Sequence, residues 1–180
     1  VEFGQKASIS DLELKAERTR LILEVLPEIP DLPGPKFIHA HIVSPHPPYI
    51  FNLDGSINPN AEDVDPFEGY RSQLEFLEPR VIEAISQIIN NSKTPPIIII
   101  EGDHAFGHKY LTSVLLALYL PESNTAALDD HMTLINVFPH IFNTYFNTHL
   151  DYLPDLSFTH TDDWYESIPI EEWNPDCRSE

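Results

Sequence analysis

Three segments of the chain are predicted to be helices, two of them because hydrophobic residues recur every three or four positions. Residues 12–26 follow an S-x-x-E capping box at positions 10–13 and stop where a run of prolines begins. Asp65 and Pro66 are the expected N-cap and first residue of the second helix, which ends at residues 90–92. Residues 132–146 form the third, with Pro139 in its first turns.

The second helix has the clearest hydrophobic stripe, and this stripe is predicted to be its buried face. Pro79 lies within the stripe, so we expect a kink or a short break there, with both helical pieces burying the same face. The stripe consists of Phe67, Tyr70, Leu74, Leu77, Val81, Ile85 and Ile88. The spacing of the third helix runs through Met132, Ile135, Phe138, Phe142 and Tyr145.

Three shorter segments have the patterns of strands. Residues 36–43 alternate between two faces, residues 95–104 are continuously apolar and β-branched, and residues 113–120 close at Pro121. The second of these suits a central strand covered on both faces. Strands that alternate with helices predict an α/β layered fold. The chain from Leu150 onward is polar and contains prolines, so an irregular segment is expected there.

Length and composition narrow the possible partners. A chain of 180 residues with 42% hydrophobic residues can form one domain with a sizeable core. The net charge of −19 excludes nucleic acid and anionic membrane surfaces as natural partners and favours a cation. The single cysteine, Cys177, can form no internal disulfide, and no membrane span or signal peptide is visible. Because the sequence starts at Val1, a processed or excised piece is one interpretation.

Candidate chemistry lies in two loops that directly follow predicted strands. If those strands are parallel, both loops lie at the same edge of the sheet, where ligands bind in α/β folds. One loop carries His46 between two prolines, and the other carries Asp103 and His104 after Gly102. A carboxylate beside an imidazole suits Zn²⁺ or Mn²⁺, and the glycine permits the bend that brings neighbouring side chains together. His108 is a possible third ligand.

Each of these residues also has a plainer interpretation. Asp103 and His104 can be a helix N-cap and an exposed side chain, and the loop around His46 can be an ordinary proline-rich surface loop. His39 and His41 are interpreted as core histidines of the first predicted strand. Nucleophile elbows, HExxH helices and phosphate-binding glycine loops do not occur in the sequence. No function is assigned to His131, His140, His149 or His160, and the acidic pairs at 129–130 and 162–163 are interpreted as solvated.

Three stretches taken together resemble a known family: "KFIHAHIVSPHPPYIF", "YRSQLEFLEPRVIEAISQIINNSKTPPIIIIEGDHA" and "VFPHIFNTYFNTHLDYLPDLSF". In this order and spacing they resemble the C-terminal half of sulfatase-like domains of the alkaline phosphatase superfamily. Within that superfamily they resemble membrane-anchored bacterial sulfatase-like proteins related to lipoteichoic acid synthase and phosphoglycerol transferases. The resemblance implies an incomplete copy of a three-layer α/β/α fold with a mostly parallel sheet. It divides the chain into a helix and proline-rich linker (1–35), the sulfatase-like part (36–158) and an irregular acidic tail (159–180).

The resemblance also implies roles for three residues. Asp103 and His104 match the family's ligands to a divalent metal ion (Mn, Zn or Ca), and His46 matches a catalytic histidine on the substrate side. The implied reaction is hydrolysis or transfer of a phosphate or sulfate ester of a small molecule, lipid or glycan. The implied location is the extracytoplasmic face of a bacterial membrane or the periplasm. Ala105 replaces the glycine that usually follows the Asp-His pair.

The family's nucleophile and a further acidic metal ligand precede the matched stretch, so no nucleophile is expected in this chain. Catalytic zinc generally has three protein ligands, and two should hold a cation weakly. We therefore expect the chain alone to be inactive and to need the N-terminal half of the same protein as a partner. An uncovered sheet would favour a homodimer or aggregation. The alternatives are a non-catalytic binding or interaction module that keeps the remnant of the fold, and an unrelated acidic α/β binding protein.

Overall fold

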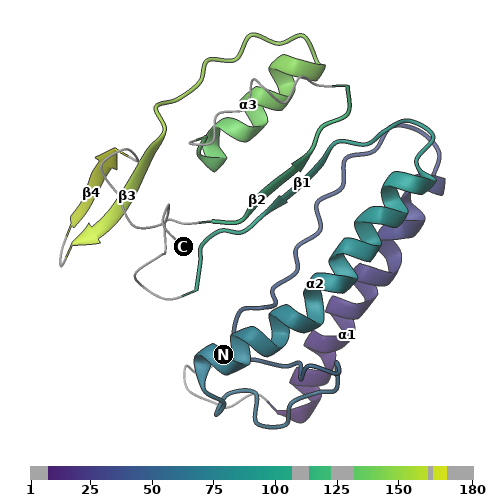
Figure 1. Ribbon diagram of the computed structural model, residues 1–180, viewed down its shortest axis with the longest axis vertical. Coiled ribbons are helices and arrows are strands. Elements are labelled where there is room, and N and C mark those ends of the chain that lie inside the picture. Colours follow the sequence, from purple (N-terminus) through teal and green to yellow (C-terminus); the bar gives the residue numbers. More distant parts are fainter. Residues whose placement is uncertain (1–7, 107–113, 123–131, 162–163, 170–180) are drawn as a thin grey trace. The chain divides into compact units, whose positions relative to one another are not determined.

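The computed structural model describes residues 8–106, 114–122, 132–161 and 164–169, and the chain divides into two compact units, Val1–Pro96 and Ile97–Glu180 (Figure 1). The described residues form helices and two small antiparallel sheets, so the fold is mixed α/β. A mostly parallel sheet does not occur among them. The boundaries predicted at residues 35 and 158 stay predictions.

The first unit contains α1 (Ile9–Val25), a short 3₁₀ helix (Leu26–Asp31) and α2 (Pro66–Asn91). Figure 1 shows α1 and α2 side by side and running in the same direction. The capping box of α1 lies two residues earlier than predicted: the Ser8 hydroxyl accepts from the Asp11 N–H at 3.2 Å, and the Asp11 carboxylate accepts from the Ser8 N–H at 3.1 Å. Serine followed by an acid three residues later occurs at Ser8 as well as at Ser10, and the earlier serine is the cap.

Asp65 caps α2 as predicted, because its carboxylate accepts from the N–H groups of Phe67 and Glu68 at 3.0 and 3.1 Å. A kink or a short break was predicted at Pro79; the break does not occur, since α2 continues through this residue as one helix, and the kink stays a prediction. The neighbouring Arg80 donates to the Phe76 carbonyl at 2.7 Å, and its guanidinium carbon lies 3.9 Å from the centre of the Phe76 ring. These contacts stabilise the turn in which the proline removes a hydrogen bond.

The core of the first unit lies between the two helices and the loop that precedes α2. Phe51 from this loop stacks on Phe76 of α2, with ring centres 4.2 Å apart, and Tyr49 lies against Gly69 so closely that a Cβ at Gly69 would meet its ring at 2.4 Å. The buried core consists of Leu12, Ala16, Ile50, Phe51, Ala61, Phe76 and Leu77. The loop thus supplies a large part of the packing.

Because this loop covers α2, the buried face of the helix differs from the predicted one. The buried residues of α2 are Gly69, Gln73, Phe76, Leu77 and Ala84. Only Leu77 of the predicted stripe is among them, whereas Phe67 and Leu74 are exposed. Hydrophobic spacing identified the helix, but the segment that packs on it selected the face.

Residues 36–43 are the main failure of strand prediction. Their backbone is not part of any ladder, and seven of the eight residues are exposed, with Phe37 80% exposed. His39 and His41, interpreted as core histidines, are exposed and lie with ring centres 6.4 Å apart. A strand needs a neighbour to accept and donate its hydrogen bonds, and no described segment pairs with this one.

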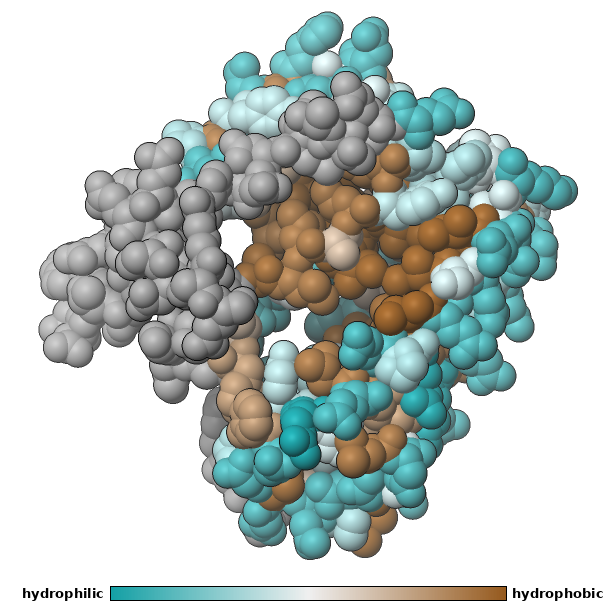
Figure 2. Space-filling view, in the orientation of Figure 1, coloured by the Kyte–Doolittle hydropathy of each residue, from teal (hydrophilic) through white to brown (hydrophobic). Residues whose placement is uncertain are grey.

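The second unit contains β1 (Ile98–Glu101) and β2 (Leu116–Tyr119), which pair antiparallel with Ile98 opposite Tyr119. Both strands were predicted, but the expectation that β1 is covered on both faces is wrong: its isoleucines are half-buried. In the described residues β2 is the one strand that pairs with β1. Figure 2 shows hydrophobic side chains at the surface over these strands.

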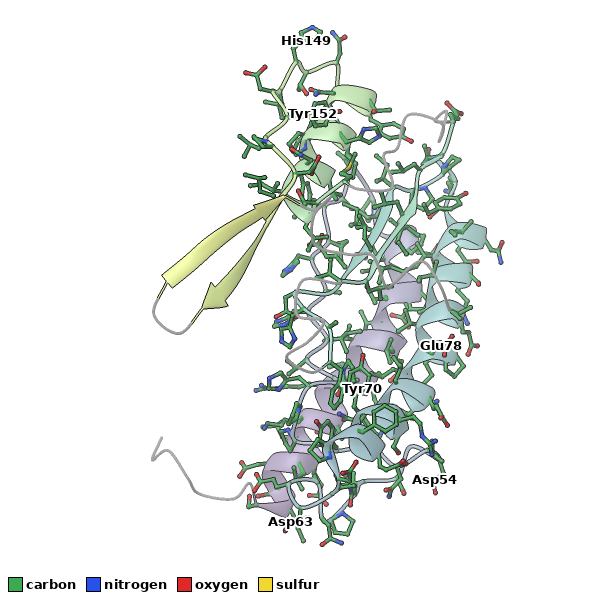
Figure 3. All side chains as sticks on the ribbon, turned by 60° about the vertical axis from the view of Figure 1, so that its left-hand side comes forward. Asp54, Asp63, Tyr70, Glu78, His149 and Tyr152 are labelled. Carbon is green, nitrogen blue, oxygen red and sulfur yellow. The ribbon has the colours of Figure 1, made fainter. Side chains whose placement is uncertain are left out.

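The helix α3 (Leu134–Tyr145) was predicted, and it too buries a face other than the predicted stripe. Its buried residues are Asn136, Val137, His140 and Ile141, whereas Ile135, Phe138 and Phe142 are exposed. The following chain runs back along α3, with Tyr152 beside the helix (Figure 3). Beyond it, β3 (Leu156–Thr161) and β4 (Trp164–Pro169) pair antiparallel where an irregular segment was predicted, because the alternation of apolar and polar residues at 156–161 is that of a strand.

None of the helices within the described ranges combines the length and the apolar composition that crossing a membrane requires.

Candidate functional site

His46 projects from a tight turn between the exposed segment 36–43 and the core loop. Its N–H donates to the Val43 carbonyl at 3.0 Å, and the peptide bonds that precede Pro45 and Pro48 are cis. Ser44 is buried at the base of the turn, and the His46 side chain is exposed. The imidazole of His46 is therefore exposed to solvent, while the start of its turn is buried in the first unit.

One contact determines which nitrogen of the His46 ring is available. Nδ1 lies 2.7 Å from the carbonyl oxygen of Pro47, and a carbonyl can only accept. Nδ1 therefore carries the proton, and in the neutral ring the lone pair is on Nε2. A lone pair held in this way can accept a proton or a hydrogen bond, or bind a cation.

The turn is held from below by Gln73 of α2, which is fully buried. Its Oε1 accepts from the Ile50 N–H at 3.0 Å and, at 3.4 Å, from the Ser44 hydroxyl. Its Nε2 donates to the Pro45 carbonyl at 3.0 Å and to the His46 carbonyl at 3.4 Å. One side chain thus contacts the backbone before, at and after His46.

Asp103 and His104 follow the end of β1. The ladder finishes where the Gly102 N–H donates to the Leu115 carbonyl at 3.0 Å, and the chain then turns away. The Asp103 carboxylate accepts from the His104 N–H at 3.1 Å. Both side chains are accessible, at 95% for Asp103 and 47% for His104. The turn lets two neighbouring side chains lie on the same side.

The donor atoms of this pair suit a divalent cation. The His104 Nδ1 lies 3.0 Å from the Ala105 carbonyl oxygen, so Nδ1 carries the proton and Nε2 of the neutral ring has the lone pair. Nε2 is 3.9 Å from Oδ2 of Asp103. Two ligands of a tetrahedral zinc are about 3.4 Å apart, given Zn–N and Zn–O bonds of about 2.1 Å. The two donor atoms are therefore somewhat farther apart than two ligands of one zinc ion.

This pair supplies two donors, and the described residues contain no group of three or more histidine, cysteine, aspartate or glutamate side chains arranged for a metal. His46 belongs to the first unit and the Asp-His pair to the second, and each is described by itself. His108, His131, Cys177 and the acidic pairs at 129–130 and 162–163 lie outside the described residues. His140 is buried beside the Tyr152 hydroxyl, whose oxygen lies 3.3 Å from Nδ1, and His149 is exposed.

Sequence reasoning missed two polar residues that organise these regions. Gln73 was visible only as a polar residue close to a hydrophobic stripe. Asp155 follows α3 in the sequence and binds to the first residues of that helix. Its carboxylate accepts from the Thr133 N–H, the Thr133 hydroxyl and the Asn136 amide at 2.7, 2.6 and 2.9 Å. Burial raises the pKa of Asp155, but these hydrogen bonds outweigh it and hold the pKa below its ordinary value.

Comparison of the chain with protein-family models, with curated proteins and with solved structures finds no match.

Proposed function

We propose that the chain is the C-terminal portion of a sulfatase-like, metal-dependent hydrolase or transferase of phosphoric or sulfuric esters. The observation that carries the proposal is the Asp103–His104 pair, whose Oδ2 and Nε2 atoms lie 3.9 Å apart just beyond the end of β1. The order of the sequence segments around this pair, which resembles the sulfatase-like family, adds to it. The substrate class is an ester of a small molecule, lipid or glycan, handled at the extracytoplasmic face of a bacterial membrane.

In this proposal Asp103 and His104 would hold a divalent cation, and His46 would be the catalytic histidine. A bound divalent ion would supply Lewis-acid stabilisation of negative charge on the ester oxygens. His46 contributes an Nε2 lone pair that accepts a hydrogen bond in the neutral ring, or a proton to donate when the ring is charged. The nucleophile and the remaining metal ligand come from the N-terminal half of the same protein.

The proposal includes a larger fold than the described residues form. In it, the chain contributes strands to a mostly parallel sheet with helices on both faces, which the N-terminal half completes. Two features support this: the isoleucines of β1 are half-buried, and the segment from 36 to 43 is apolar in part and unpaired within the described ranges. Both are typical of strands whose neighbours lie elsewhere.

A second function, a non-catalytic interaction module, is favoured by one observation. Large hydrophobic side chains are exposed on several described elements, among them Phe37, Phe67, Leu115, Ile135 and Phe146. Where exposed apolar side chains gather, as they do over β1 and β2 (Figure 2), they mark interaction surfaces or self-association. In this case the chain forms homodimers, and the Asp-His pair contributes nothing to function.

Calorimetric titration with Zn²⁺ and with Mn²⁺ tests the first function. We expect weak binding by the chain alone, with affinity lowered more than about tenfold by Asp103→Ala or by His104→Ala, since losing even an outer-shell partner of a metal costs about that much. Asp151→Ala and His149→Ala, which remove exposed residues of the same types, are the matched controls. Equal affinity in all five proteins would contradict the assignment.

A second measurement separates the two functions. The chain alone should not hydrolyse p-nitrophenyl phosphate or p-nitrophenyl sulfate, and addition of the N-terminal half should restore hydrolysis that depends on Asp103 and His46. Hydrolysis that is unaffected by Asp103→Ala would overturn the proposed function, and a dimer that binds no metal would favour the interaction module.

A further inference from the structure

The turn that carries His46 has few hydrogen-bond donors of its own. Three of its five residues, from Ser44 to Pro48, are prolines, which have no N–H. The His46 N–H is used by the Val43 carbonyl. The protein donor to the Pro45 and His46 carbonyls comes from another part of the chain.

Gln73 is that donor, and its amide is used to capacity. A glutamine side chain has two N–H donors and an oxygen with two lone pairs. In Gln73 the donors go to the Pro45 and His46 carbonyls, and the lone pairs accept from the Ile50 N–H and the Ser44 hydroxyl. The side chain is 0% exposed and lies on the same face of α2 as Phe76 and Leu77. Packing alone would favour a leucine there, because burying an amide is unfavourable unless each of its polar atoms is paired.

We propose that Gln73 is the positioning residue of His46. By holding the backbone on both sides of the histidine, it keeps the Pro47 carbonyl 2.7 Å from the His46 Nδ1 and so fixes the ring in the Nδ1–H form, with Nε2 free. The importance of this for catalysis rests on the proposed function, but the effect on the ring does not. A buried amide on a helix thus sets the protonated nitrogen of an exposed imidazole.

The test is the tautomer of His46 in the complete chain, measured from ¹⁵N chemical shifts of the imidazole at a pH where the ring is neutral. The His46 signal is identified by its loss in His46→Gln. In the native chain we expect Nδ1–H to predominate. In Gln73→Leu, and in Gln73→Glu, which keeps an acceptor for Ile50 but loses both N–H donors, the ratio of Nδ1–H to Nε2–H should fall about fivefold, the effect of losing one typical hydrogen bond.

The matched control is Gln87→Leu, which removes an exposed glutamine of the same helix and should leave the ratio unchanged. An unchanged His46 tautomer in a folded Gln73 variant would overturn the proposal, and Gln73→Glu decides the question where Gln73→Leu does not fold. The outcome is independent of the metal titration. A changed tautomer with no binding at Asp103 contradicts the proposed function alone, whereas metal binding with an unchanged tautomer contradicts only the role of Gln73.

Discussion

The two units are held together by different means. In the first, seven mutually packed apolar residues from α1, α2 and the loop between them form a core, and Gln73 is the polar group inserted at its edge. In the second, the buried apolar side chains among the described residues are Val137 and Ile141, both on α3. There the chain is held by side-chain amides that bond to backbone.

Two asparagines of α3, seven residues apart, make these bonds in the same way. Asn136 donates to the Leu153 carbonyl at 2.7 Å and accepts from the Leu153 N–H at 2.9 Å. Asn143 donates to the Leu150 carbonyl at 2.9 Å and accepts from the Leu150 N–H at 2.7 Å. Each side-chain amide thus makes two hydrogen bonds with the backbone of a single residue, as the backbone of a neighbouring strand would. The turn that carries His46 therefore belongs to a unit with an apolar core. β1 and the Asp-His pair belong to a unit in which few of the described apolar side chains are buried.

The largest expected effect comes from removing a core ring of the first unit. Phe51→Ala deletes a side chain that is 1% exposed and stacked on Phe76, and it should lower the free energy of unfolding of that unit by about 3–5 kcal/mol. Urea titration followed by the amide signals of α1 and α2 measures this. Phe37→Ala, which removes an exposed ring, should change it by less than about 0.5 kcal/mol.

If the amide signals of α3 lose as much stability as those of α1 and α2 in Phe51→Ala, the units do not differ in the way described, and the comparison fails.

The second largest effect is expected in the second unit, where side-chain amides rather than apolar packing hold the chain. Asn136→Ala removes a side chain that is 1% exposed and leaves the Leu153 N–H and carbonyl without their partner, so α3 should lose about 1–3 kcal/mol. Hydrogen exchange of the α3 amides measures the loss. Asn90→Ala, at an exposed position near the end of α2, is the control. Unchanged exchange in α3 would mean that the amide pairing does not stabilise the second unit.

The smallest expected effect depends on pH. Because hydrogen bonds hold the pKa of Asp155 below its ordinary value, the stability it contributes is present above about pH 3.9, the unfolded value, and is lost as the pH falls through the lower folded value. Asp155→Asn keeps an acceptor, should cost less than about 1 kcal/mol at neutral pH, and removes this dependence. Urea titrations of both proteins between neutral pH and acid, followed by α3 signals, test it. Parallel pH curves for the two proteins would contradict it.

Much of the fold could be predicted because its signals are local. Asp65 followed by Pro66, the β-branched run at 97–100 and the spacing in 132–146 identify α2, β1 and α3 without knowledge of their neighbours. The failures concern partners. Whether residues 36–43 join a sheet, whether β1 pairs in parallel and which side of α2 is buried all depend on segments far away in the sequence, and the spacing of apolar residues does not encode them.

The candidate site divides in the same way. The Asp-His pair could be predicted as a pair because adjacent residues after Gly102 need only a local turn to place their side chains together. Gln73 could not, because its partners are 23 to 29 residues earlier and are mostly backbone atoms, which leave no pattern in the sequence. Likewise, no local sequence pattern identifies Asp155 as the residue that accepts hydrogen bonds from the start of α3, which begins 21 residues earlier.

The contact between Tyr49 and Gly69 limits how α2 can vary. Exchanging a glycine inside a helix for alanine ordinarily gains about 1 kcal/mol, which makes such positions attractive for stabilisation by design. At position 69 the new methyl carbon would lie 2.4 Å from the tyrosine ring and 2.8 Å from a methyl of Val64. The helix therefore has to keep glycine, a weak helix former, where the aromatic ring crosses it. A search for stabilised variants should leave this position unchanged and look for gains on the exposed side of α2.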